Sequence, residues 1–195
     1  MFYLFTVVIA TISIAIANFL YDGVYDLASF AVHFGITAFG VVAVVLIDAI
    51  FAFLTRRLPE AWFGPEAKLF SVGKGEKLFY RKTKINVWKK YVPEWGCFTG
   101  FHKDKLQSPA ESSYLSRFLL ESNYGVLGHI TGALFGYLIM LIPILRPISV
   151  ALPIAIVNMI LNLLPTMILR ANTPALRRLY RGAVEREKRI SITNK

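Results

Sequence analysis

The sequence is short of the residues that cross-link a secreted protein or keep a domain soluble. It contains a single cysteine, Cys97, which excludes an intramolecular disulfide. No motif around Cys97 would activate a thiolate, so we interpret it as structural. Charged residues make up only 17% of the 195 residues and hydrophobic residues 55%, a composition too apolar for a typical soluble domain of this length. The chain therefore requires a non-aqueous solvent.

Acidic side chains are also scarce. There are 12 Asp and Glu residues against 22 Lys and Arg, which gives a net charge of +10. The cations lie between and after the apolar blocks, a distribution typical of contact with anionic membrane lipid. A nucleic-acid-binding protein would not need such long uncharged stretches, so we expect membrane lipids and no nucleic acid as partners.

Four apolar blocks predict four membrane spans. They lie at about residues 2–20, 27–54, 126–145 and 147–169. The first is long enough to cross about 30 Å of hydrocarbon, and it lacks the basic segment and cleavage site of a secretory signal. Short connections at 21–26 and at Arg146 and Pro147 pair the blocks. We therefore predict an all-α integral membrane protein with two antiparallel hairpins.

The distribution of charge predicts the orientation and the segments. The first connection carries Asp22 and Asp26, whereas Arg56 and Arg57 close the second block. The positive-inside rule then places both termini on the cytoplasmic side of the cell membrane. The predicted segments are an N-terminal hairpin (1–57), a basic and aromatic cytoplasmic or interfacial segment (58–117), a second hairpin (118–169) and a basic tail (170–195).

The interfacial segment has its own predicted pattern. Residues 59–72 alternate aromatic and charged side chains, as an amphipathic piece at headgroup level does. Gly73 and Gly75 are expected to break it, and Pro93 to end any helix at Val92. Residues 112–123 are expected to form an interfacial helix that leads into the third span.

Polar side chains in the spans are the first candidates for a site, because each charged one costs roughly 2.5–3.5 kcal/mol to insert. Glu121 and His129 share one helix face about 12 Å apart, too far for direct contact. His129 suits proton transfer near neutral pH. The alternative is a hydrogen-bonded packing histidine with a Glu121 solvated at the headgroups. His33 is expected to be packed or hydrogen-bonded.

Small and amide residues line the same spans. Gly128, Gly132 and Gly136 form a stripe that predicts close helix packing, with homo-oligomerisation or docking of a partner span as the alternative. Asn158 is expected to tie helices together. Asn162 lies four residues later, and Asp48 faces either Arg57 or an inner-leaflet pocket.

A basic and aromatic run supplies candidates for binding. Its cations are suited to the phosphate or headgroup of an activated acyl donor, or else to a face attracted to anionic lipid. The run contains Tyr80, Arg81, Lys82, Lys84, Trp88, Lys89, Lys90 and Tyr91. The three histidines, His102 among them, are scattered without metal-ligand spacing, and no phosphate loop or nucleophile elbow occurs. We therefore expect no metal and no cofactor.

Five segments follow one another along the chain: YRK, WKKYVPEWG, FHKDKL, the helix from Glu121 to His129, and NLLPTMILRANTPAL. In this order they resemble the glycosyl diaponeurosporenoate acyltransferases of staphyloxanthin-type carotenoid pathways. The resemblance covers residues 79–178. It departs from the family pattern at Val126, Thr173 and Ala175. The matched positions are Arg81, Lys82, Trp88, Lys89, Glu94, Gly96, Glu121, His129, Asn162, Arg170, Asn172, Pro174 and Leu176.

The resemblance implies acyl transfer from an activated thioester to a hydroxyl of a lipid-embedded, glycosylated acceptor. On the hypothesis of acyl transfer, His129 is the expected base and Glu121 or Glu94 its orienter or partner. The expected substrate-binding residues are Asp48, Arg81, Lys82, Trp88, Lys89, Asn162, Arg170 and Asn172. The alternative function is a non-catalytic membrane partner or assembly factor that docks through the glycine stripe and the basic segments.

Overall fold

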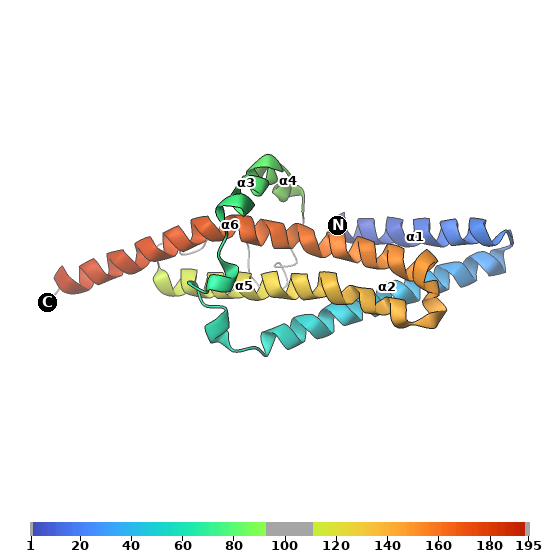
Figure 1. Ribbon diagram of the computed structural model, residues 1–195, viewed down its shortest axis with the longest axis horizontal. Coiled ribbons are helices and arrows are strands. Elements are labelled where there is room, and N and C mark those ends of the chain that lie inside the picture. The colour runs from blue at the N-terminus through green and yellow to red at the C-terminus, as the bar shows by residue number, and fades with distance from the viewer. Residues whose placement is uncertain (1, 93–110, 194–195) are drawn as a thin grey trace. The chain divides into compact units, whose positions relative to one another are not determined.

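The computed structural model describes residues 2–92 and 111–193, and its regular elements in these ranges are helical (Figure 1). Four of these helical stretches are long and apolar enough to cross a membrane, which confirms the predicted all-α membrane fold. The described residues form two compact units. The first unit lies within Met1–Arg56 and Gly128–Leu164, and the second within Arg57–Leu127 and Pro165–Lys195.

The first unit begins with the predicted N-terminal hairpin, made of α1 (Phe2–Asp22) and α2 (Leu27–Arg56), which lie antiparallel in Figure 1. Gly23 makes the turn with a φ of +71°, a conformation that costs glycine little. Asp26 then caps α2, because its Oδ1 accepts a hydrogen bond of 2.7 Å from the backbone N–H of Ser29. The uncharged run of α1 and this cap explain why both helices begin and end close to the predicted positions.

The second hairpin has a longer connection than the sequence predicts. The first unit contains the end of α5 (Ser112–Phe135), then the short helical turns η5 (Gly136–Leu141), η6 (Pro143–Leu145) and η7 (Arg146–Ala151), and the start of α6 (Leu152–Thr193). The prediction of a two-residue turn is wrong, because the prolines lack an N–H donor and Arg146 adopts a φ of +44°. Val44, Ile139, Leu145, Val150, Ala151, Ile154 and Ala155 form the core of this unit.

The second unit contains the interfacial segment, whose first part forms short turns and no α-helix. Its turns are η1 (Glu60–Trp62) and η2 (Lys68–Phe70). The aromatic pattern divides between two environments. Phe63 and Phe70 are buried, and the ring of Phe63 stacks on Tyr124 with centroids 4.0 Å apart, whereas Trp62 and Leu69 are exposed. Half of the apolar groups expected at headgroup level therefore serve the core of this unit.

The remaining elements of the second unit are α3 (Lys74–Lys82), α4 (Ile85–Trp88), η3 (Lys89–Tyr91) and the parts of α5 and α6 that belong to it. Gly73 is the N-cap of α3 but Gly75 lies inside the helix, so the predicted break at Gly75 is wrong. The helix expected from residue 112 is confirmed. α6 continues past the fourth apolar block to Thr193, with Pro165 and Pro174 inside it.

Candidate functional site

A polar cluster in the first unit joins three spans. Asn162 of α6 donates from Nδ2 to Oδ2 of Asp48 in α2 at 2.9 Å, and its Oδ1 lies 3.0 Å from Nδ1 of His129 in α5. Asn158 donates from Nδ2 to the other carboxylate oxygen of Asp48 at 3.2 Å. The structure thus brings together Asp48, His129 and Asn162, which the sequence selects as site residues from three separate helices.

The cluster determines which nitrogen of His129 carries the proton. The amide nitrogen of Asn162 donates to the carboxylate, so its oxygen is the acceptor that faces the imidazole. Nδ1 of His129 must then carry hydrogen, and the lone pair of the neutral ring lies on Nε2. An imidazole in this tautomer is a base at Nε2 and is oriented through Nδ1, the arrangement that general-base catalysis uses.

Two glycines allow these polar groups to approach α5. A Cβ added to Gly132 would lie 3.1 Å from both Oδ1 of Asn162 and Oδ1 of Asp48. A Cβ added to Gly136 would lie 2.5 Å from Nδ2 of Asn158, which also donates to the carbonyl oxygen of Gly132 at 3.3 Å. Gly128 would meet nothing within 4 Å. Close packing therefore involves the second and third glycines of the stripe.

Neither residue predicted to orient His129 is the partner that the structure gives to Nδ1. Glu121 belongs to the second unit, where one of its oxygens lies 4.0 Å from Nη2 of Arg117. Glu94 lies outside the described residues, as do Pro93, Gly96, Cys97 and His102. The orienting contact comes instead from Asn162, which the sequence selects for substrate binding.

In the second unit Arg170 is bound to an acid that the sequence analysis did not select. Its Nε and Nη2 donate to the two oxygens of Glu76 at 2.5 and 2.8 Å, and Nη2 also lies 3.3 Å from the carbonyl oxygen of Ser71. The hydroxyl of Tyr80 donates to the same carboxylate at 2.5 Å. Glu76 therefore offsets the charge of Arg170, the predicted donor-binding cation.

This network changes the protonation behaviour of its members in the interfacial segment. The hydrogen bond from Arg170 lowers the pKa of Glu76 below its usual range. Burial, together with the hydrogen bond to Glu76, raises the pKa of Tyr80 to about 12. Tyr80 therefore stays neutral and Glu76 charged across the physiological range.

The other predicted binding residues of the second unit fall into two groups. Nζ of Lys89 lies 3.2 Å from Oδ1 of Asn172, so two of the predicted binding residues are in contact. Trp88 is partly buried and donates from Nε1 to the carbonyl oxygen of Thr83 at 3.0 Å. Arg81 and Lys82 are exposed in the last turn of α3.

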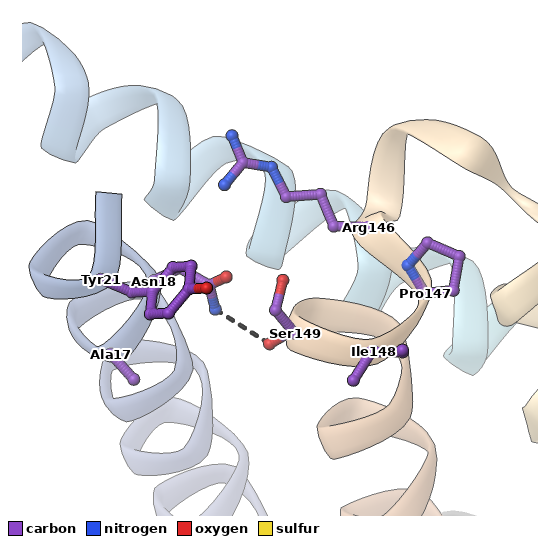
Figure 2. Close-up of a pocket in the computed structure, with 7 residues that line it drawn as sticks. All are labelled: Ala17, Asn18, Tyr21, Arg146, Pro147, Ile148 and Ser149. Atoms are coloured by element: carbon purple, nitrogen blue, oxygen red, sulfur yellow. Dashed lines mark hydrogen bonds between the residues drawn. The ribbon is translucent and has the colours of Figure 1, made fainter. Parts of the chain in front are cut away.

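A second polar group of the first unit lies where its two hairpins turn. Asp22 accepts a hydrogen bond of 2.7 Å from Nη1 of Arg146 and lies 3.3 Å from Nε2 of the buried His33. Beside it, Asn18 donates to the carbonyl oxygen of Ser149 at 2.9 Å (Figure 2). A pocket here is lined by Ala17, Asn18, Tyr21, Arg146, Pro147, Ile148 and Ser149. The structure thus gives His33 a polar partner, as its predicted role requires.

Sequence reasoning gave Asn158 a packing role and missed Glu76. The four-residue spacing of Asn158 and Asn162 was a usable signal, because it puts two amides on one helix face. No sequence pattern near Glu76 indicated that it pairs with Arg170, because the two residues are 94 positions apart. Within residues 2–92 and 111–193, no group of three His, Cys, Asp or Glu side chains could hold a metal ion.

Comparison with known proteins places the chain in a family. A family model described as glycosyl-4,4'-diaponeurosporenoate acyltransferase matches residues 59–182, which is well over half of the chain. This match confirms the resemblance seen at residues 79–178 and extends it at both ends. Neither the curated proteins nor the solved structures yield a match. The chain belongs to the glycosyl-4,4'-diaponeurosporenoate acyltransferase family.

Proposed function

We propose that this membrane protein transfers a fatty acyl chain from an activated thioester to a hydroxyl of a lipid-embedded, glycosylated acceptor. The family's named activity supports the reaction class. The observation that carries the proposal is the contact between His129 and Asn162, because it orients an imidazole base inside candidate membrane spans. Asp48 extends this arrangement through Asn162.

The proposed reaction needs one base and no covalent enzyme intermediate. Nε2 of His129 takes the proton of the acceptor hydroxyl while the hydroxyl oxygen attacks the thioester carbonyl. The new C–O bond forms, the C–S bond breaks, and the departing thiolate takes the proton back from the imidazolium. The negative charge of Asp48, linked through Asn162, stabilises the imidazolium that forms between the two proton transfers.

The depth of the cluster supports an acceptor that resides in the membrane. Asp48 precedes Arg56, the last residue of α2, by eight positions, which corresponds to about 12 Å along the helix. A base at this depth suits a hydroxyl carried by a lipid better than one on a soluble molecule. An acyl chain and a lipid-embedded acceptor both reach this level from the bilayer.

The basic segment supports a charged donor. We propose that Arg81, Lys82 and Lys89 attract the donor's phosphate or headgroup, with Trp88 and Asn172 beside them. In the proposed orientation this segment and both termini face the cytoplasm, where activated thioesters are made. The basis for this orientation is the distribution of charge, with acids in the first connection and the arginines Arg56 and Arg57 at the end of the second span.

The test is a transfer assay with the purified chain in lipid nanodiscs. Acyl-coenzyme A is added with a glycolipid acceptor, and the products are identified by mass spectrometry. The proposal predicts one acyl ester on a sugar hydroxyl, and none when the sugar hydroxyls are methylated. If no ester forms with any thioester donor while a partner protein co-purifies, the assembly-factor function replaces this proposal.

A further inference from the structure

Three arginines follow one face of α6 in the second unit. Arg170, Arg177 and Arg181 are spaced by seven and four residues, which aligns them along the helix. The outer two are paired with acids. Arg170 binds Glu76 as described above, and Arg181 donates to the two oxygens of Glu66 at 2.8 and 2.6 Å.

The middle arginine differs from its neighbours. Across residues 2–92 and 111–193, no carboxylate lies within ion-pair distance of Arg177. Its Nη2 donates to the carbonyl oxygen of Ala67 at 2.7 Å, whereas its Nε is buried and has no hydrogen-bond partner in that part of the chain. The residue as a whole is partly exposed, which leaves part of it accessible to a ligand.

A partly buried cation without an acid is costly, and buried donors without partners are rare in folded proteins. The nearby Glu66 does not offset it fully, because both of its oxygens already accept hydrogen bonds from Arg181. Further positive charge lies beside the site in the sequence, at the exposed Lys68, which follows Ala67. The local field therefore favours an anion that approaches Arg177.

We propose that Arg177 is the anchor of a phosphate-binding subsite. A guanidinium presents a planar fork of donors that matches phosphate oxygens, and a bound phosphate offsets the uncompensated charge. Two sources share this chemistry: the phosphate groups of a nucleotide-linked thioester donor and the headgroup of an anionic phospholipid. The subsite does not depend on acyl transfer, because its occupancy is measured without turnover.

The experiment measures phosphate binding by the full chain in nanodiscs with two probes. Coenzyme A is titrated into nanodiscs of phosphatidylcholine, and phosphatidylglycerol is added to a second set and its retention measured by native mass spectrometry. Arg177→Gln is compared with Arg178→Gln, which makes the same charge change at an exposed neighbouring position. The subsite predicts binding of at least one probe, weakened about tenfold or more by Arg177→Gln and less than twofold by Arg178→Gln.

Each result decides the proposal. Loss of coenzyme A binding identifies the donor phosphate as the ligand, and loss of phosphatidylglycerol identifies the lipid headgroup. Wild-type protein that binds neither probe, or two variants that bind alike, would overturn the subsite. If Arg177→Gln does not fold, Arg177→Lys replaces it, because lysine keeps the charge but lacks the planar fork. Binding several-fold weaker than wild type is then expected, and unchanged binding would overturn the proposed geometry.

Discussion

Nδ1 of His129 lies 3.0 Å from Oδ1 of Asn162, so an amide of the fourth span orients the imidazole of the third. The same amide donates to Asp48 in the second span. Each of these polar groups is costly to place in a membrane alone, and together they satisfy one another. The network therefore has both a structural and a catalytic consequence, and variants can separate the two.

Asp48→Asn tests the carboxylate at the end of this network. The substitution removes the charge and turns an amide N–H toward the donor groups of Asn158 or Asn162. We expect the unfolding free energy to fall by about 1–3 kcal/mol and transfer to fall tenfold or more. Thermal unfolding and kcat/KM in nanodiscs measure the two effects. Asp26→Asn is the matched control, since Asn caps a helix as well as Asp does. Equal effects of the two variants would show that Asp48 has no special role.

Gly136→Ala tests the close approach of the spans. The new Cβ would lie 2.5 Å from Nδ2 of Asn158 and 3.3 Å from Cγ2 of Val44, so the amide that donates to Asp48 must shift. Overpacking of this kind costs about 1–3 kcal/mol, measurable as a lower Tm in detergent. Gly128→Ala, which meets nothing within 4 Å, is expected to keep the wild-type Tm. A similar Tm for both variants would contradict the packing account.

The phenol of Tyr80 provides a spectroscopic test of the second unit. Burial and its hydrogen bond to Glu76 raise the pKa of Tyr80 to about 12, from an ordinary value of 10.0. Its stabilising contribution is therefore complete below pH 10 and disappears as the pH rises through about 12. Absorbance titration of the tyrosines should show a late step that Tyr80→Phe removes. Identical titration curves would exclude this environment.

Glu76→Gln tests the ion pair with Arg170 by its pH dependence. Because the folded-state pKa of Glu76 is lowered from 4.5, its contribution is present above that pH and is lost as the pH falls through the lowered value. We expect the Tm of the wild type to drop on acidification below about 4.5 more steeply than that of Glu76→Gln. Glu60→Gln, at an exposed position, should retain the wild-type slope. Parallel slopes for all three proteins would contradict the pairing.

The sequence predicts the spans well because the length of an apolar run is a local property. Helix α1 matches its block to within two residues, and α2 likewise. The connection between the last two spans was predicted less well, because hydropathy does not reveal the short turns that its prolines and the positive φ of Arg146 produce. The polar groups were selected by their cost in the membrane, and the structure brings Asp48, His129 and Asn162 into contact. The rotation of each helix about its axis cannot be read from one sequence.

That limit explains the differences at the site. The acyl-transfer hypothesis made Glu121 or Glu94 the orienter of His129, whereas the contact of Nδ1 comes from Asn162 across the hairpin. The partner of Arg170 was missed for the same reason, because Glu76 is distant in sequence and resembles any exposed acid of a short helix. Tertiary pairing decides both contacts, and periodicity carries no information about it.

The most direct measurement is the acyl-transfer rate of His129→Ala, compared with wild-type protein in the same nanodiscs. The account predicts that the variant keeps most of its thermal stability and loses about 10²–10⁴-fold in transfer, the usual contribution of a positioned general base. His33→Ala controls for the loss of an imidazole elsewhere in the first unit, and it should retain transfer wherever it folds. A His129→Ala protein that transfers the acyl chain at the wild-type rate would contradict the account.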